Sequence, residues 1–217
     1  MKTLALEFSS GRRSVAVLVD GIVRGEAQEA GGRHTRAFAM MDAALRTAKI
    51  EREEIELIAV GLGPGSYTGI RSAIAIAQGW QVARGVNLAG VNSVEAMAAQ
   101  AHAEGRRGRI HNFIDAQRGE FYFGAYELVE EGPRLVEPLR IVTPEKARLS
   151  AQGGSAVVWP ELREAFPDAT ILEPDAAMVG KLALRRGEFV DGATLEPVYL
   201  RPVQFVKAPA ARKIPSA

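Results

Sequence analysis

The alternation of apolar and polar residues predicts three β-strands at the start of the chain. Leu4, Leu6 and Phe8 alternate with polar or small residues, which gives the period of two that strands show. A second alternating run ends at Asp20-Gly21, a dipeptide that favours a two-residue hairpin turn. Residues 22–27 complete the set. We therefore expect an antiparallel meander of three strands.

Helical spacing and short apolar runs alternate in the next part of the chain. Phe38, Met41 and Leu45 lie at helical spacing behind Thr35, which can cap a helix. The resulting order, βββαβαβα, predicts an α/β fold with a mixed sheet and helices on both faces. The expected elements are a helix over 35–49, a strand over 55–60, a helix over 70–84, a strand over 86–91 and a helix over 94–102.

A second, smaller unit begins near residue 106. Residues 110–115 and 120–127 predict a hairpin, and Asp175 can cap a last helix that ends at Gly187. We expect a loosely held tail after residue 202, and no repeat of fixed period is visible. The other expected elements are a helix over 144–149, a strand over 157–159, a helix over 160–166, a strand over 170–172 and a helix over 176–186; the predicted units are 1–105, 106–190 and 191–217.

A glycine-rich segment connects the strand 55–60 to the helix 70–84. Four glycines occur in the nine residues from Gly61 to Gly69. A strand, a glycine loop and a helix in this order can direct backbone N–H groups at an anion. The loop lacks the lysine of a Walker A motif, and residues 81–92 lack the acidic residue that a dinucleotide fingerprint needs. The spacing therefore favours a tight strand-to-helix connection over a phosphate site.

The helix over 70–84 is apolar nearly all round. It carries no charged residue between Arg71 and Arg84. A surface helix of a globular domain has one apolar stripe and one polar face, so this helix lies either in the centre of a core or against another chain. In a chain of this length we favour contact with another chain, because an apolar patch is seldom left exposed.

Composition and charge exclude several classes of protein. The 217 residues carry a formal net charge of +1, which argues against a dedicated nucleic-acid binder. The absence of cysteine excludes disulfides and thiolate zinc sites, and fits a cytoplasmic protein. No apolar run reaches the ~18 residues that a membrane span needs, and the N-terminus lacks the apolar core of a signal peptide.

Few residues suggest catalysis. The three histidines show no i, i+4 pair, so no metal site is predicted. Ser66 lacks the glycines that a nucleophile elbow needs two places before and two places after the serine, because these positions are Pro64 and Thr68. Glu7, followed by Ser9-Ser10-Gly11, could hold a metal–phosphate complex or be an ordinary charge at a strand end. Asp115 and Glu120 flank the hairpin turn and are consistent with a salt-bridged turn.

Five segments together resemble the signature of the bacterial TsaB (YeaZ) family. The resemblance runs from Thr3 to about Arg201. The segments are residues 61–71 (GLGPGSYTGIR), His34-Thr35, Gly90 to Ser93, Asp115 to Tyr122 and Pro197 to Arg201.

This resemblance implies a fold and a function. The family has the actin/Hsp70/sugar-kinase fold, with two tandem ribonuclease-H-like subdomains and mixed sheets. TsaB is generally non-catalytic; it pairs with TsaD, the catalytic subunit of tRNA threonylcarbamoyladenosine (t6A) synthesis, and a TsaE ATPase joins them. The resemblance implies a cytoplasmic scaffold subunit for the modification of adenosine 37 in ANN-decoding tRNAs. Such a subunit needs no cofactor of its own, ATP being expected on its partner subunits, and contacts tRNA only through the complex.

The resemblance also implies a partner surface on the first two helices. The same surface is expected to form a homodimer when the chain is isolated, since one patch can meet its own copy. We expect Ile74→Glu and Met41→Glu to weaken association while leaving the fold largely intact. The predicted interface residues are Thr35, Phe38, Met40, Met41, Ala44, Ile70, Arg71, Ile74, Ala77, Gln78 and Gln81.

The chain departs from the family pattern after the first strand. The family usually has Asp-Thr-Ser or Asp-Thr-Ala there, whereas this chain has Glu7-Phe8-Ser9-Ser10. In nucleotide-binding relatives the aspartate helps to hold the metal–phosphate group, so the longer Glu7 and bulky Phe8 argue against an ATP site. Two alternatives stay open: a weak ATPase or kinase-like enzyme that acts alone, and a metallopeptidase. The weak candidates for nucleotide contact are Ser9, Ser10, Gly63 and Gly65.

The basic residues offer a further possible contact. Arg106, Arg107 and Arg109 cluster in the chain, and Lys207, Arg212 and Lys213 lie in the tail. We expect them to be solvated surface that adds non-specific phosphate contacts within the complex. The isolated chain is expected to bind tRNA negligibly at physiological salt.

Overall fold

The first half of the chain forms a mixed five-stranded sheet. The computed structural model describes residues 1–30 and 36–201. In the sheet order β3-β2-β1-β4-β5, strand β1 pairs antiparallel with β2 and parallel with β4, as the predicted meander and crossover require. The strands are β1 (Lys2–Glu7), β2 (Arg12–Val19), β3 (Ile22–Ala30), β4 (Leu57–Gly61) and β5 (Asn87–Val91).

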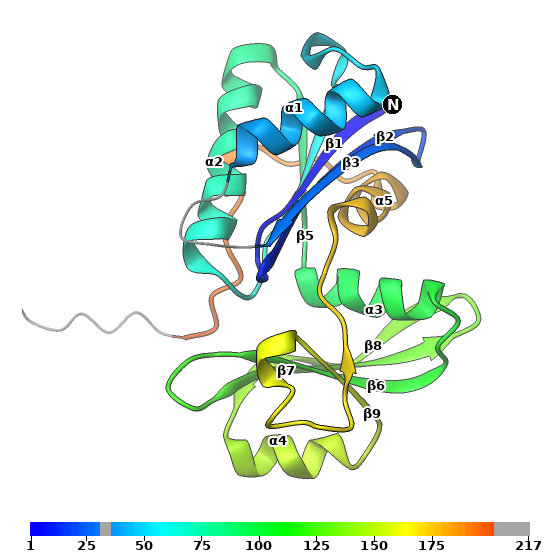
Figure 1. The fold of residues 1–217 in the computed structure, drawn as a ribbon, viewed down its shortest axis with the longest axis vertical. Helices are drawn as coiled ribbons and strands as arrows, with labels where there is room; N and C mark the ends of the chain where they lie inside the picture. The colour runs from blue at the N-terminus through cyan, green and yellow to red at the C-terminus, as the bar shows by residue number, and fades with distance from the viewer. Residues whose placement is uncertain (31–35, 202–217) are drawn as a thin grey trace, which may run out of the picture.

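The second sheet repeats the topology of the first. Its order, β8-β7-β6-β9-β10, again places three antiparallel strands beside two parallel ones. This repetition confirms the predicted α/β fold of the actin/Hsp70/sugar-kinase type, with two mixed sheets in tandem (Figure 1). The strands are β6 (Gly108–Asp115), β7 (Phe121–Val129), β8 (Gly132–Val142), β9 (Ser155–Val158) and β10 (Thr170–Ile171).

The helices cover the two sheets, and each sheet with the helices packed on it forms one lobe of the molecule. Helices α1 (Ala37–Ala48) and α2 (Tyr67–Arg84) bury apolar side chains against one face of the first sheet. Helix α3 (Ser93–Ala103) lies between the lobes and packs on both, with Ala96 and Ala99 on the first sheet and Val94 and Met97 on the second. Helix α4 (Pro144–Ala151) packs on the outer face of the second sheet.

Helix α5 (Ala176–Arg186) packs on the first sheet, although it follows the second sheet in the chain. Val179, Leu182 and Ala183 are buried against Ala5 and Leu18. The backbone N–H of Ala176 also donates to Ser14 Oγ at 2.9 Å. The predicted unit 106–190 is therefore divided in space, because its last helix completes the core of the first lobe.

Two elements differ from the prediction. Strand β8 was not expected: Pro133 and Pro138 interrupt the pattern, and the strand is an exposed sheet edge without regular alternation. The predicted helix over 160–166 is only a 3₁₀ turn, Pro160–Leu162. Further 3₁₀ turns occupy Arg52–Glu54 and Gly192–Thr194.

The ends of the first two helices also depart from the prediction. Helix α2 begins at Tyr67, three residues before the predicted start, because Ser66 Oγ accepts from the Gly69 N–H and caps it. Helix α1 ends where Lys49 adopts a left-handed conformation. The predicted cap Thr35 and the predicted tail over 203–217 lie outside the described residues.

Candidate functional site

The glycine segment packs closely against the turn after β1 and leads into the start of α2. The backbone N–H of Ser66 donates to Ser9 O at 2.7 Å, and that of Gly63 donates to Ser93 Oγ at 3.0 Å. Gly65 has φ +147°, and a Cβ there would overlap Ser9 O and crowd Trp159. These N–H groups therefore face protein oxygens, and the predicted strand-to-helix connection is confirmed.

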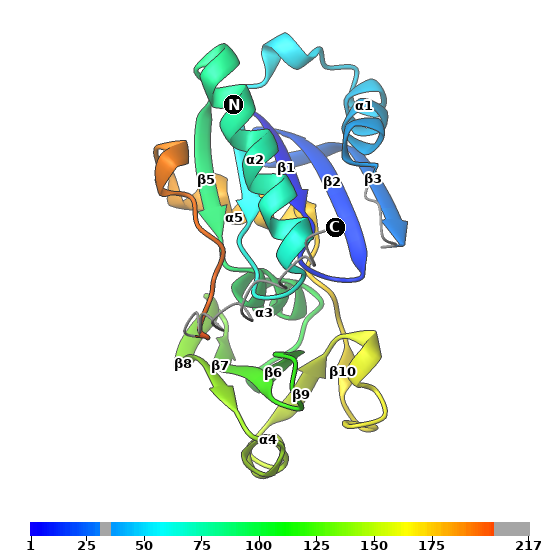
Figure 2. The same ribbon diagram turned by 90° about the vertical axis from the view of Figure 1, so that its left-hand side faces the viewer.

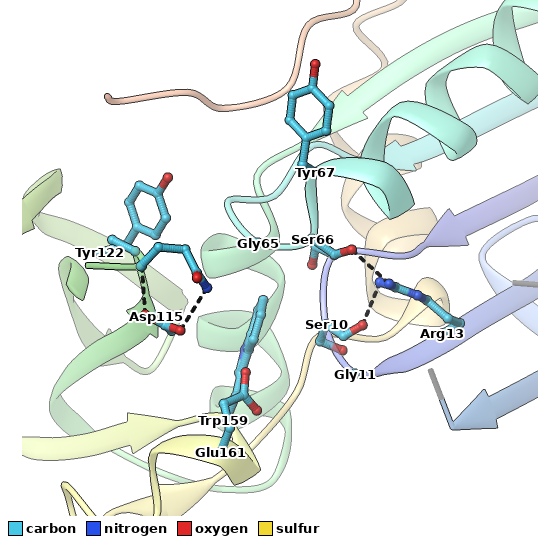
Figure 3. Close-up of a pocket in the computed structure, with 13 residues that line it drawn as sticks. Ser10, Gly11, Arg13, Gly65, Ser66, Tyr67, Asp115, Tyr122, Trp159 and Glu161 are labelled. Carbon is cyan, nitrogen blue, oxygen red and sulfur yellow. Dashed lines mark hydrogen bonds between the residues drawn. The ribbon is translucent and has the colours of Figure 1, made fainter. Parts of the chain in front are cut away.

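Arg13, on β2, joins the two loops that meet at this point. Its guanidinium donates to Ser10 O at 2.6 Å through Nη1 and to Ser66 Oγ at 2.9 Å through Nη2 (Figure 3). The side chain is buried, and burial lowers the pKa of Arg13 while the carboxylates of Glu7 and Glu173 oppose that change. No sequence pattern pointed to this role of Arg13, because its partner Ser66 lies far along the chain.

A cleft of about 410 Å³ lies between the two lobes beside these two loops. The turn after β1 and the glycine segment form one wall, and the end of β6, Tyr122 and Trp159 form the other (Figure 3). Among the weak nucleotide candidates, Ser9, Ser10 and Gly65 line the cleft, whereas Gly63 does not. The lining residues are Ser9, Ser10, Gly11, Arg13, Gly65, Ser66, Tyr67, Asp115, Ala116, Gln117, Tyr122, Trp159 and Glu161.

Glu7 points into the protein and is not among the residues that line the cleft. Its carboxylate accepts from the Ser9 N–H and from Ser93 Oγ, both at 2.7 Å, and the residue is fully buried. Burial raises the pKa of Glu7, and the hydrogen bonds from Ser9 and Ser93 oppose that rise. In residues 1–30 and 36–201, no group of three or more His, Cys, Asp or Glu side chains could hold a metal ion.

The predicted partner surface is corrected by the burial of its residues. Ile74 is only 5% exposed, because its stripe of α2 faces the first sheet. Gln78 and Gln81 are half-buried and hold the backbone of Gly192 through hydrogen bonds of 2.8 and 2.7 Å. Phe38 and Arg71 are exposed. The predicted interface residues that belong to the core instead are Met40, Met41, Ala44, Ile70, Ile74 and Ala77.

The opposite stripe of α2 faces solvent and is almost free of charge. Val82 is 89% exposed, and Phe38 of α1, on the same side of the sheet, is 63% exposed. Arg71 is the charged residue of this stripe before Arg84 at the helix end. We call this stripe the outer face of α2; it comprises Tyr67, Thr68, Arg71, Ala75, Gly79, Val82 and Ala83.

Comparison with known proteins places the chain in a family. Residues 19–181 match the family model described as TsaD, tRNA N6-adenosine threonylcarbamoyltransferase. The tRNA threonylcarbamoyladenosine biosynthesis protein TsaB of Escherichia coli K12 is 31% identical over 222 residues, which covers 93% of this chain and 95% of that protein. The chain belongs to the TsaB (YeaZ) family.

Other TsaB relatives match over a similar length. The TsaB protein of Haemophilus influenzae is 27% identical, and the match covers 91% of this chain and 92% of that protein. The solved structure of YeaZ from Pseudomonas aeruginosa has a TM-score of 0.78 and 28% identity, and the match covers 92% of this chain and 99% of that one. In the described part of this TsaB-family chain, no helix is long and apolar enough to cross a membrane.

Three TsaB signature segments meet at one end of the cleft. Val198 N donates to Leu62 O in the glycine segment at 2.9 Å. Arg201 pairs with Glu120 of the segment over 115–122, at 2.9 Å. Each of the three segments contributed to the resemblance, but they are far apart in the sequence, so the sequence did not predict that they contact one another.

Proposed function

We propose that this chain is a subunit of the system that makes threonylcarbamoyladenosine at adenosine 37 of ANN-decoding tRNAs. The observation that carries the proposal is the match, over nearly the whole length of both chains, to proteins named for tRNA threonylcarbamoyladenosine biosynthesis. Deletion of the gene for this chain should remove that nucleoside from tRNA hydrolysates, as mass spectrometry would detect. An unchanged nucleoside content would overturn the proposal.

Within that system we infer a non-catalytic role. The turn after β1 and the glycine segment are held together by Arg13 and by the Ser66–Ser9 hydrogen bond, and Glu7 is turned into the core. These contacts support a structural role for the turn after β1 and the glycine segment over a role in binding phosphate. ATP and the catalytic residues belong, in this proposal, to the TsaD-like and TsaE-like subunits.

The alternative, a weak ATPase or kinase-like enzyme acting alone, has one supporting observation. Ser9, Ser10 and Gly65 do line a cleft between two lobes. Calorimetric titration of the isolated chain with ATP and Mg²⁺ separates the two proposals. Tight binding accompanied by phosphate release would overturn the non-catalytic role, and we expect neither.

The outer face of α2 is the proposed contact for the TsaD-like subunit, with Phe38 beside it. An almost uncharged stripe of small and apolar residues suits close helix packing and is unusual on free surface. In the isolated chain the same stripe would meet its own copy and give a homodimer. A TsaE-like ATPase would join the complex, and tRNA would bind through the complex, in the cytoplasm.

Charge substitutions test this surface. Ala75→Glu places a carboxylate on the exposed stripe, where association would remove it from water. Co-purification with a TsaD-like protein and sedimentation of the isolated chain should both show weakened association. Leu149→Glu, on exposed α4, is the matched control and should associate like the parent. Unchanged association of Ala75→Glu would place the contact elsewhere.

A further inference from the structure

The segment over residues 190–201 is fastened to the first lobe as far as Tyr199. Val190 forms an antiparallel bridge with Leu88 at the free edge of β5. Leu195 is buried in the core under α2. Beyond it, the Tyr199 ring stacks on Tyr67, with ring centroids 5.6 Å apart and planes inclined by 26°. The segment thus reaches the rim of the cleft, because Tyr67 is one of the cleft residues.

Arg201 then crosses to the second lobe. Its Nη2 donates to Ala116 O at 2.9 Å and lies 2.9 Å from Glu120 Oε2, with a longer contact of 3.5 Å to Gln117 O. Ala116 and Gln117 line the opposite wall of the cleft. One guanidinium therefore holds the turn between β6 and β7, at the mouth of the cleft.

The turn that Arg201 holds has an unfavourable backbone. Gln117 and Arg118 have φ values of 64° and 58°, in the left-handed region that side chains other than glycine rarely adopt. Such conformations persist only when surrounding contacts fix them. Asp115 contributes by accepting from the Gln117 N–H at 2.7 Å, and Arg201 contributes from the other lobe.

Another tie between the lobes lies on the other side of the cleft. There the chain passes from β10 to α5, and Glu173 accepts from the Arg12 N–H at 2.9 Å. In Figure 2 this link descends on the right of α3, whereas the segment over 190–201 descends on the left. Besides helix α3, which packs on both lobes, the lobes are thus joined by the chain on one side of α3 and by the side-chain contacts of Arg201 on the other.

We propose that residues 197–201 are a strap that holds the cleft closed, and that release of Arg201 lets the lobes move apart. The ion pair of Arg201 with Glu120 is partly exposed on both sides, so it is a contact of modest strength that can open reversibly. The anchors at Val198 and Tyr199 stay on the first lobe when Arg201 is released. The strap therefore sets the width of the cleft without belonging to the fold's core.

Distance measurements between the lobes test the strap. The chain has no cysteine, so Glu26→Cys on β3 and Lys146→Cys on α4 introduce two unique positions for spin labels. Both positions are exposed. The doubly labelled full chain is diluted with unlabelled chain, so that double electron–electron resonance records distances within one molecule. Circular dichroism confirms that each variant is folded.

Arg201→Ala and Glu120→Ala remove the two sides of the same contact. Both should shift the label distances to longer values and broaden their distribution, and both should speed amide hydrogen exchange in residues 116–122 several-fold. Arg118→Ala removes an exposed arginine from the same turn and should leave the distances as in the parent. Unchanged distances in a folded Arg201→Ala chain would overturn the proposal, as would an equal shift in Arg118→Ala.

Discussion

Glu7 and Gly61 fill complementary space at the ends of two adjacent strands. Leu6 pairs with Val60 in the parallel register of β1 and β4, which places the two residues that follow side by side. A Cβ on Gly61 would overlap the buried Glu7 carboxylate, which is fixed by Ser9 and Ser93. The glycine is therefore needed for the close approach of a side chain.

Gly61→Ala should consequently destabilise the chain. Overpacking of a fixed, buried group typically costs about 1–3 kcal/mol. Glu7→Asp shortens the side chain and should recover part of this loss in the double variant. Urea unfolding of the parent, both single variants and the double variant gives the coupling free energy. Strictly additive effects would show that the carboxylate does not fill the space beside Gly61.

The raised pKa of Glu7 predicts a pH dependence of stability. Between the usual carboxyl pKa of 4.5 and the raised value, the folded chain keeps a proton that the unfolded chain has released. The free energy of unfolding therefore falls as pH rises through that interval, and stays lower above it. Glu7→Gln cannot titrate and should lose this part of the slope. Urea unfolding across a pH series measures it; a slope that survives in the variant would belong to another group.

Single residues were predictable only where the signal was local. The polar turn at Ser9-Ser10 and the loop at Gly65 were found from runs of adjacent residues, and both line the cleft. Arg13 was missed, because it follows Arg12 in an ordinary strand pattern and its hydrogen-bond partner Ser66 is 53 residues away. The inward turn of Glu7 was missed for the same reason, since Ser93 lies 86 residues further on.

Helix α2 shows the corresponding limit for a whole element. Its C-terminal end and its lack of charge were readable from sequence, but both of its stripes are apolar. Periodicity alone could not decide which stripe faces the sheet. The larger side chains of Ile70 and Ile74 pack inward, and the smaller Ala75 and Gly79 are left outside. The interface predicted on the Ile74 stripe was therefore wrong.

Matched substitutions on neighbouring positions of α2 separate core from surface. Ile74→Glu would bury an unpaired charge, and we expect a loss of several kcal/mol in stability, enough to unfold much of the chain. Ala75→Glu lies one residue on, is exposed, and should melt close to the parent. Thermal unfolding followed by circular dichroism distinguishes them. Similar melting of the two variants would contradict this assignment of faces.

The whole molecule repeats one strand order although its sequence shows no fixed period. The order of strands depends on which strand edges pair and on how the crossover connections run. Many different sequences are compatible with one strand order, so a repeated order does not require a repeated sequence. The repeat is uneven: α2 crosses between β4 and β5, whereas the 3₁₀ turn Pro160–Leu162 takes that place between β9 and β10. The repeated fold was thus predictable from the resemblance to a family, whereas the residue pattern indicated only that a second unit begins near residue 106.

The charge distribution predicts weak binding of tRNA by the isolated chain. The net charge is +1, Arg106 and Arg109 pair with Glu104 and Glu127, and Arg107 donates to backbone carbonyls. This basic cluster is therefore already engaged within the protein and has little capacity to displace counterions from phosphates. A gel shift at physiological salt should show negligible binding, with a basic RNA-binding protein as positive control. Micromolar affinity that resists added salt would contradict this expectation.

The position of α5 imposes an order on synthesis. One face of the first sheet, which includes Ala5, Leu18 and Leu57, is covered by residues of α5 that are translated after the whole second sheet. A growing chain therefore exposes apolar surface on its first lobe until residue 186 has left the ribosome. A truncated product such as 1–105 would carry that surface permanently and would be a target for chaperones and proteases. Completion of the first lobe therefore waits for the last helix of the chain.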